Sequence, residues 1–218
     1  MRVFLVGMMG SGKTAVGKLL ARSLELDFVD MDEEIKKREG KTISRIFQEF
    51  GEGYFRAREK DLLRELSQRD NLVVATGGGV VLDAENRQLL HEGRTVFLYA
   101  PPPVLAQRVD PSIRPLLKGS SVKGKLAKIW ESRRVFYEEF PRIDTEHLQP
   151  FEVVARVALR LFDEEPQEVF NPVHPVFTGK GLFKRVSRED LVFTTETVHR
   201  IYEDLFPPTC LLYTSDAA

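Results

Sequence analysis

The chain has 218 residues, which suits one large domain or one domain with an appendage. Its 32 basic and 33 acidic residues nearly cancel, so no overall field would attract nucleic acid or an anionic membrane. Its single cysteine, Cys210, excludes an intrachain disulfide, and without a signal peptide or a membrane-spanning apolar run we expect a cytoplasmic protein.

The first predicted strand and helix flank a glycine-rich turn. Residues 3–6 form an apolar run typical of a buried strand, and residues 14–24 have helical spacing. Between them, residues 7–14 read G-M-M-G-S-G-K-T and satisfy the phosphate-loop pattern G-x-x-x-x-G-K-[S/T]. Such a turn directs backbone N–H groups and the positive end of a helix at a phosphate, so the motif predicts a nucleotide site.

The chemistry of this motif assigns roles to its residues. Lys13 is expected to neutralise the β- and γ-phosphates, and the Thr14 hydroxyl is expected to ligate Mg²⁺. A glycine-rich turn that binds no nucleotide is the alternative. The expected nucleotide contacts in the loop are Gly10, Ser11, Gly12, Lys13, Thr14 and Ala15.

A second short strand, within residues 27–32, ends in acidic residues. No later apolar strand ends in an aspartate at the usual Walker B position, so Asp30 is the candidate metal ligand beside Thr14. Asp32 lies on the same side of the chain if the strand geometry persists, where it could orient or deprotonate an acceptor hydroxyl. The alternative is that both carboxylates only cap the next helix.

Helical patterns follow. Residues 33–38 are expected to be helical up to Gly40, and Thr42 can cap the next stretch. Gly51 and Gly53 should interrupt that stretch before a helix resumes over residues 54–67. Before the interruption one face should carry the apolar positions Ile43, Ile46, Phe47 and Phe50. After it, the residues expected to point inward are Phe55, Leu62, Leu63 and Leu66.

The middle of the chain alternates strands and helices. A central strand over residues 72–76 runs into three glycines, and Asp83 can cap a helix that reaches Leu90. A buried strand over residues 95–100 precedes three prolines, which are tolerated in the first turn of a helix.

The stretch over residues 109–125 is basic and rich in Pro, Gly and Ser, and we interpret it as a mobile lid that closes over the phosphates. A helix over residues 126–139, an edge strand near 142–144 and a helix over 151–162 should follow. Beyond them we expect a linker at 163–172, a partial pattern at 173–206 and an unstructured tail at 207–218.

Six motifs over residues 1–162 occur in the order of one enzyme family, and the chain resembles shikimate kinases. The motifs are G-x-x-G-x-G-K-T (7–14), D-x-D (30–32), F-R-x-x-E (55–59), G-G-G (77–79), R-P-L-L (114–117) and R-x-x-x-Y (133–137). The resemblance implies phosphorylation of the 3-hydroxyl of shikimate by ATP with Mg²⁺, by a monomeric kinase domain. Likeness to nucleoside monophosphate kinases implies a three-layer α/β/α fold whose five parallel strands follow the order 2-3-1-4-5.

The resemblance also assigns further site residues. Arg56 and Arg133 correspond to a clamp on the substrate carboxylate, and Glu59, one helical turn from Arg56, should orient it. The backbone of Gly78 and Gly79 should approach the ring hydroxyls, and Asp32 should bind the 3-hydroxyl and act as its base. The substrate set is thus Asp32, Arg56, Glu59, Gly77, Gly78, Gly79 and Arg133, and the catalytic set is Lys13, Asp32 and Arg114.

Two further arginines complete the predicted nucleotide site. Arg114 on the lid should reach the transferring phosphoryl group, and Arg108 should stack on adenine. The acidic start of the lid and the R-V-F-Y sequence after Arg133 depart from the family pattern. Arg58 and Arg134 are the alternative clamp residues if the register is shifted.

The partial pattern at 173–206 resembles the beginning of 3-dehydroquinate synthase. The sequence therefore suggests a fused enzyme whose second part is cut short, with no synthase activity and with a tail that continues from an unrelated reading frame. A plain C-terminal extension is the alternative. For the kinase part, the alternatives are a gluconate or nucleotide kinase of the same fold, and a regulatory module that binds nucleotide without turnover.

Overall fold

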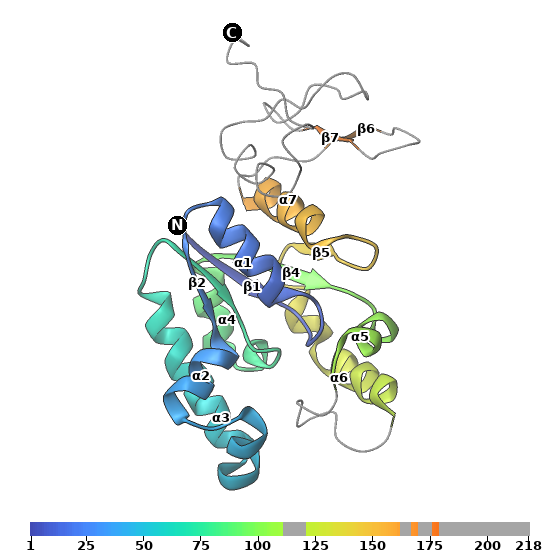
Figure 1. Cartoon of the computed structure of the whole chain (residues 1–218). Coiled ribbons are helices and arrows are strands. Elements are labelled where there is room, and N and C mark those ends of the chain that lie inside the picture. The colour runs from blue at the N-terminus through green and yellow to red at the C-terminus, as the bar shows by residue number, and fades with distance from the viewer. Residues whose placement is uncertain (111–120, 162–166, 170–175, 179–218) are drawn as a thin grey trace.

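A five-stranded parallel sheet lies at the centre of the chain (Figure 1). The computed structural model describes residues 1–110, 121–161, 167–169 and 176–178. The sheet order is β2-β3-β1-β4-β5, which confirms the predicted order. The strands are β1 (Arg2–Val6), β2 (Asp27–Asp30), β3 (Leu72–Ala75), β4 (Arg94–Tyr99) and β5 (Arg142–Asp144).

Helices cover both faces of the sheet, because successive side chains of each strand point to opposite sides. In β1, Val3 and Leu5 pack with α1 and α7, while Phe4 and Val6 pack with the helices of the other face. This arrangement confirms the three-layer fold. The helices are α1 (Lys13–Ser23), α2 (Met31–Glu39), α3 (Ile43–Ser67), α4 (Ala84–His91), α5 (Pro102–Arg108), α6 (Val122–Tyr137) and α7 (Pro150–Leu161), with a 3-10 turn η1 (Val80–Leu82).

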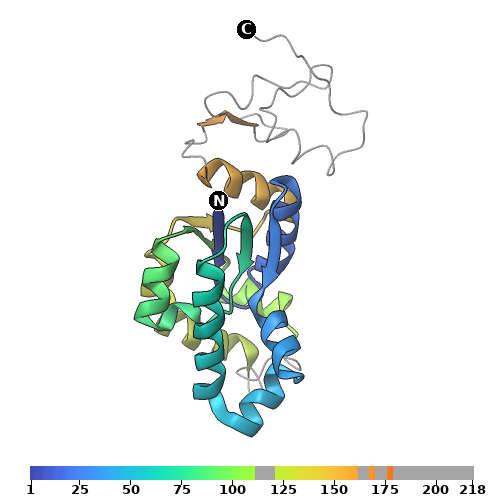
Figure 2. The same cartoon turned by 90° about the vertical axis from the view of Figure 1, so that its left-hand side faces the viewer.

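The long helix α3 contains the predicted interruption. Figure 2 shows α2 and the first part of α3 extending beyond the end of the sheet. Gly51, with φ 81° and ψ 170°, breaks the helical geometry, whereas Gly53 remains helical. Phe50, expected to share a face with Ile46, lies next to the break and is 48% exposed, and its ring packs on Tyr54 at 4.9 Å between centroids.

Two segments differ from the sequence-based expectation. Helix α6 begins at Val122 rather than at 126, because the Ser121 hydroxyl accepts a hydrogen bond from the Gly124 N–H at 3.3 Å and caps it. The rest of the predicted lid, residues 111–120, lies outside the described residues. Strand β6 (Gln167–Val169) falls within the expected linker and pairs antiparallel with β7 (Val176–Thr178). The other residues beyond 161 also lie outside the described ranges.

Among the helices of the described part of the chain, none combines the length and the apolar character needed to cross a membrane.

The cap of α4 gives a first expected result on stability. Asp83 accepts a hydrogen bond from the Asn86 N–H at 3.1 Å and pairs with Lys60 at 3.0 Å. We expect Asp83→Ala to lower the free energy of unfolding at pH 7 by about 1 kcal/mol, the typical value of a helix cap. Urea denaturation would measure the loss, and Asp61→Ala, which removes only exposed ion pairs, is the matched control.

The same cap should depend on pH with a definite sign. Burial raises the pKa of Asp83, but the hydrogen bonds from Lys60 and from the Asn86 N–H outweigh it and leave the pKa below its usual value. A lowered pKa in the folded state means that the contribution is complete above the unfolded pKa of about 3.9 and is lost as the pH falls through the folded value. The difference between wild type and Asp83→Ala should therefore shrink on acidification. A difference that grew at low pH would contradict this account.

Candidate active site

One cavity of about 780 Å³ opens beside the C-terminal ends of β1, β2 and β3. It is lined by the phosphate loop, by the start of α2, by α3, by Gly77–Gly79 and by residues of α5 and α6. Of the predicted site residues in the described ranges, all line this cavity except Ser11, which lines an adjoining cavity of about 420 Å³. Arg114 lies outside the described residues.

The phosphate loop has the local geometry that its sequence predicts. Gly12 caps α1 with φ 95°, a left-handed conformation that favours glycine. Lys13 follows at the first helical position and is only 9% exposed. Its Nζ donates to the carbonyl oxygens of Gly7 and Met8, both at 2.8 Å. The ammonium group is thereby held within the loop, beside the N-terminus of α1, where phosphate oxygens would bind.

Asp30 caps α2, as one alternative predicted, and also lies beside Thr14; its role as a metal ligand stays a prediction. Its Oδ1 accepts a hydrogen bond from the Glu33 N–H at 3.2 Å and so caps α2. Its Oδ2 accepts a hydrogen bond from the Thr14 hydroxyl at 2.6 Å. A hydroxyl and a carboxylate side by side are oxygen donors of the kind Mg²⁺ uses, usually with phosphate and water oxygens completing its shell. In the described ranges no group of three or more His, Cys, Asp or Glu residues forms an all-protein metal site.

Asp32 lines the cavity, as predicted, but from a helix and not from an extended strand. The strand geometry does not persist, because β2 ends at Asp30 and α2 begins at Met31. Asp32 therefore lies in the first turn of a helix, where the helix dipole favours a negative charge. Its Oδ1 would lie 3.2 Å from a Cβ added to Gly77, which places the carboxylate next to the glycine segment.

Arg56 and Glu59 form an ion pair on α3 in which Glu59 is buried and Arg56 is partly exposed. Arg56 Nη1 donates to Glu59 Oε2 at 2.6 Å, and Nε and Nη2 donate to Glu52 Oε1 at 3.2 and 3.0 Å. Glu59 is 1% exposed, and among the described residues its Oε1 accepts no hydrogen bond. The pair lies one helical turn apart, as the F-R-x-x-E motif predicts.

The environment of Glu59 shifts its pKa in a clear direction. Burial raises the pKa of Glu59, and the neighbouring Asp32 carboxylate raises it further. The positive charges of Arg56 and Arg133 act in the opposite sense but do not cancel the effect of burial. A buried carboxyl group of this kind depends on its arginine partner to remain ionised.

The three glycines after β3 leave room for this ion pair. A Cβ on Gly77 would lie 2.1 Å from Glu59 Oε1, and a Cβ on Gly79 would lie 2.3 Å from Arg56 Cζ. The sequence predicted only a close approach of backbone to substrate. The structure adds that Gly77 and Gly79 also allow the side chains of α3 to approach the segment.

Arg133 approaches the glycine segment from α6. It is 6% exposed, and its Nη1 donates to the Gly78 carbonyl oxygen at 2.8 Å. The alternative clamp residues do not line the cavity. Arg58 pairs with Asp61 at 3.0 Å and Arg134 lies 3.6 Å from Glu131, and both guanidinium groups belong to exposed side chains.

Arg108 lies where the two cavities meet. Its guanidinium donates to the carbonyl oxygens of Thr145 and Glu146 at 2.8 and 2.9 Å, and to the Thr145 hydroxyl at 3.2 Å. These bonds fix the side chain against the segment between β5 and α7. Stacking on adenine stays a prediction.

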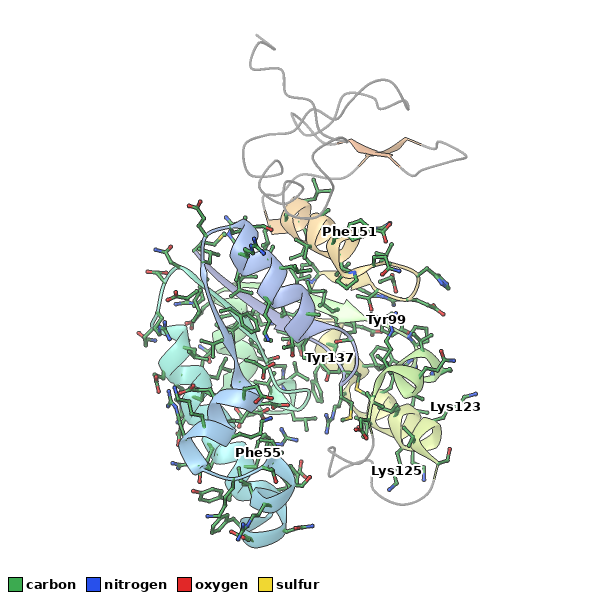
Figure 3. All side chains as sticks on the ribbon, in the orientation of Figure 1. Phe55, Tyr99, Lys123, Lys125, Tyr137 and Phe151 are labelled. Carbon is green, nitrogen blue, oxygen red and sulfur yellow. The ribbon has the colours of Figure 1, made fainter. Side chains whose placement is uncertain are left out.

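Several lining residues were not predicted. Phe47 and Phe55 line the cavity, and Figure 3 shows Phe55 on α3. Their helical spacing indicated only an apolar face. Phe55 also begins the quoted F-R-x-x-E motif, but no role was assigned to it, and no motif included Phe47. Residues 145–150 beside the second cavity have no motif at all. Tyr137 was part of a quoted motif, yet chemistry alone suggested no role for it.

Comparison with known proteins gives consistent matches. The sequence model of the shikimate kinase family matches residues 9–162. A shikimate kinase from Persephonella marina is 41% identical over 162 residues, which cover 73% of this chain and 98% of that protein. The structure of shikimate kinase from Acinetobacter baumannii in complex with shikimate superposes with a TM-score of 0.72 and 37% identity, over 74% of this chain and 93% of that chain.

A longer relative matches nearly the whole chain. The bifunctional shikimate kinase/3-dehydroquinate synthase of Thermotoga maritima is 54% identical over 213 residues, 98% of this chain. The match spans 43% of that protein, so the chain corresponds to less than half of it. Together with the family match over residues 9–162, this similarity shows that the chain belongs to the shikimate kinase family.

Proposed function

We propose that the chain transfers the γ-phosphoryl group of ATP to the 3-hydroxyl of shikimate, giving shikimate 3-phosphate and ADP. One observation carries the proposal: two guanidinium groups, Arg56 and Arg133, line the same cavity as the phosphate loop and Asp32. A cavity that offers a phosphate site, an acidic group and paired arginines suits a phosphoryl acceptor that has both a hydroxyl and a carboxylate.

The substrate carboxylate would bind to the arginines. Arg56 uses part of its donor set on Glu59 and Glu52, and Arg133 uses one N–H on Gly78. Each guanidinium carries five N–H donors, so both keep donors for a carboxylate. Their existing bonds hold them in place before the substrate arrives, which reduces the cost of ordering them on binding.

The reaction requires a proton acceptor and charge stabilisation. Asp32 would orient the 3-hydroxyl and accept its proton as the oxygen attacks the γ-phosphorus and the bond to the β–γ bridging oxygen breaks. Lys13 would stabilise the negative charge on the transferred group, and we propose that Arg114 adds to this. Thr14 and Asp30 would hold Mg²⁺, which neutralises phosphate charge when bound.

We further propose the wider setting of this activity. Shikimate is an intermediate of aromatic amino-acid biosynthesis, and the kinase would act there in the cytoplasm, as a monomeric domain or as part of a fused enzyme. The bifunctional relative, which matches 98% of this chain, supports the interpretation of residues 173–206 as the beginning of a 3-dehydroquinate-synthase-like part. The limits of the domain, linker and tail stay predictions.

The direct test is ADP release from ATP and Mg²⁺, coupled to an optical assay, with and without shikimate. We expect release that depends on shikimate, both in the full chain and in a version that ends at Asp163. Gluconate and nucleoside monophosphates serve as alternative acceptors. Turnover with one of them and not with shikimate would replace the proposed substrate. Nucleotide binding without any acceptor-dependent turnover would favour a regulatory module.

A further inference from the structure

The last residue of α6, Tyr137, is a buried polar group for which the reaction described above has no use. Its side chain is fully buried, and Figure 3 places it near the centre of the molecule, at the sheet. Its hydroxyl donates a hydrogen bond to the carbonyl oxygen of Gly78. Arg133, one helical turn earlier, donates to the same oxygen at 2.8 Å. Two side chains from one face of α6 therefore converge on a single peptide group of the glycine segment.

The phenol and the guanidinium also interact with each other. Burial raises the pKa of Tyr137 to about 12, while the charge of Arg133 and a hydrogen bond from it act to lower the pKa. Tyr137 therefore remains a neutral hydroxyl that donates to the Gly78 carbonyl oxygen. Because Arg133 donates to the same carbonyl oxygen, the phenol and the guanidinium lie side by side, and the shared acceptor restricts the direction of the planar guanidinium.

Fixing the Gly78 carbonyl also fixes an N–H group. The peptide between Gly78 and Gly79 is planar and trans, so the N–H of Gly79 points away from the side to which the carbonyl points. Because α6 holds the carbonyl, this N–H is directed away from α6. The Val80 N–H donates to the Gly77 carbonyl oxygen at 3.2 Å and closes a turn around this peptide, and the bonds from α6 add a second restraint on its carbonyl group.

The ring of Tyr137 is held as firmly as its hydroxyl. It stacks on Phe97 of the central sheet, with centroids 5.0 Å apart and planes at 7°, and on Trp130 at 6.4 Å and 10°. Stacking on a sheet residue anchors the ring to a rigid element. The stacked ring therefore holds the hydroxyl in one position in the interior of the protein.

We propose that Tyr137 is a positioning residue for the shikimate site: its hydroxyl sets both the Gly78–Gly79 peptide and the Arg133 guanidinium in the geometry that binds substrate. The inference rests on the proposed function, since it concerns the same cavity. It assigns Tyr137 no contact with the nucleotide. A loss of its hydroxyl should therefore weaken binding of shikimate and leave binding of ATP nearly unchanged.

The test is Tyr137→Phe, which removes the hydroxyl and keeps the stacked ring. We expect the KM for shikimate to rise about tenfold, as a loss of about 1.4 kcal/mol implies, with less than a twofold change in the KM for ATP. The dissociation constant of shikimate, measured by calorimetry without nucleotide, should rise by the same factor. Tyr99→Phe is the matched control, because Tyr99 belongs to the same group of rings, packing on Phe97 and Trp130, and should change neither KM.

The outcomes separate the inference from the proposed function. A purely structural tyrosine would lower the melting temperature of Tyr137→Phe and leave the ratio of the two KM values as in wild type, which would overturn the inference. Equal rises in both KM values would overturn it as well. If the wild-type chain neither binds nor phosphorylates shikimate, the proposed function is wrong, and the inference that depends on it is wrong as well.

Discussion

Replacing Asp32 by asparagine is expected to lower kcat about 10²- to 10⁴-fold, the range that a general base contributes. The asparagine amide keeps the size of the side chain and can still hydrogen-bond a hydroxyl, but it cannot accept the proton. The fold should remain intact, because Asp32 lies in the first turn of α2 and the capping bond to this helix comes from Asp30. The KM for ATP should change little.

Glu34→Gln is the matched control for this variant. Glu34 lies two residues further along α2 and pairs with Arg38 at 2.7 Å, and it does not line the cavity. We expect its turnover to equal that of wild type. Measurement of kcat and both KM values for the two variants, with melting temperatures as a check on folding, decides the role. An Asp32→Asn enzyme with near wild-type kcat would show that Asp32 is not the base.

The sequence predicted most of the fold because its signals are local. The order of apolar runs, the Asp83 and Thr42 caps and the glycine at the end of α2 each fix an element through its own residues. The phosphate loop is equally local, since strand, turn and helix are contiguous in the chain. Spacing placed Phe50 on one face with Ile46 but did not show that Phe50, next to the break at Gly51, would be exposed while Ile46 is buried.

The candidate site was harder to predict, since its geometry depends on contacts between distant segments. No sequence signal indicated that Gly77 and Gly79 leave room for side chains of α3, because the two segments are not adjacent in the chain. Asp32 was expected to lie on an extension of β2, but it lies in the first turn of α2, because the capping bond of Asp30 ends the strand at that residue. Arg56, Glu59 and Arg133 were located only through a family resemblance, and the structure supplies the bonds that order them.

The second large effect is expected at Arg56. Changing Arg56 to lysine keeps the positive charge beside Glu59 but removes the planar guanidinium. That group donates to Glu59 and Glu52, and its remaining donors would bind the substrate carboxylate. Hydrogen bonds to charged groups contribute about 1.5–3 kcal/mol, so the KM for shikimate should rise about 10- to 100-fold. The KM for ATP should stay close to that of wild type.

Arg58→Lys tests the same change two residues away. Arg58 is exposed, pairs with Asp61 and lies over the ring of Tyr54, so we expect this variant to bind shikimate as wild type does. Retention of charge at position 56 matters for the comparison, because an uncharged residue there would leave Glu59 buried without the partner that lowers its pKa and would destabilise the fold as well. A larger loss of shikimate affinity in Arg58→Lys than in Arg56→Lys would show that Arg58, on the exposed face of α3, binds the carboxylate in place of Arg56. Equal KM values for shikimate in wild type and Arg56→Lys would show that Arg56 does not bind the substrate carboxylate.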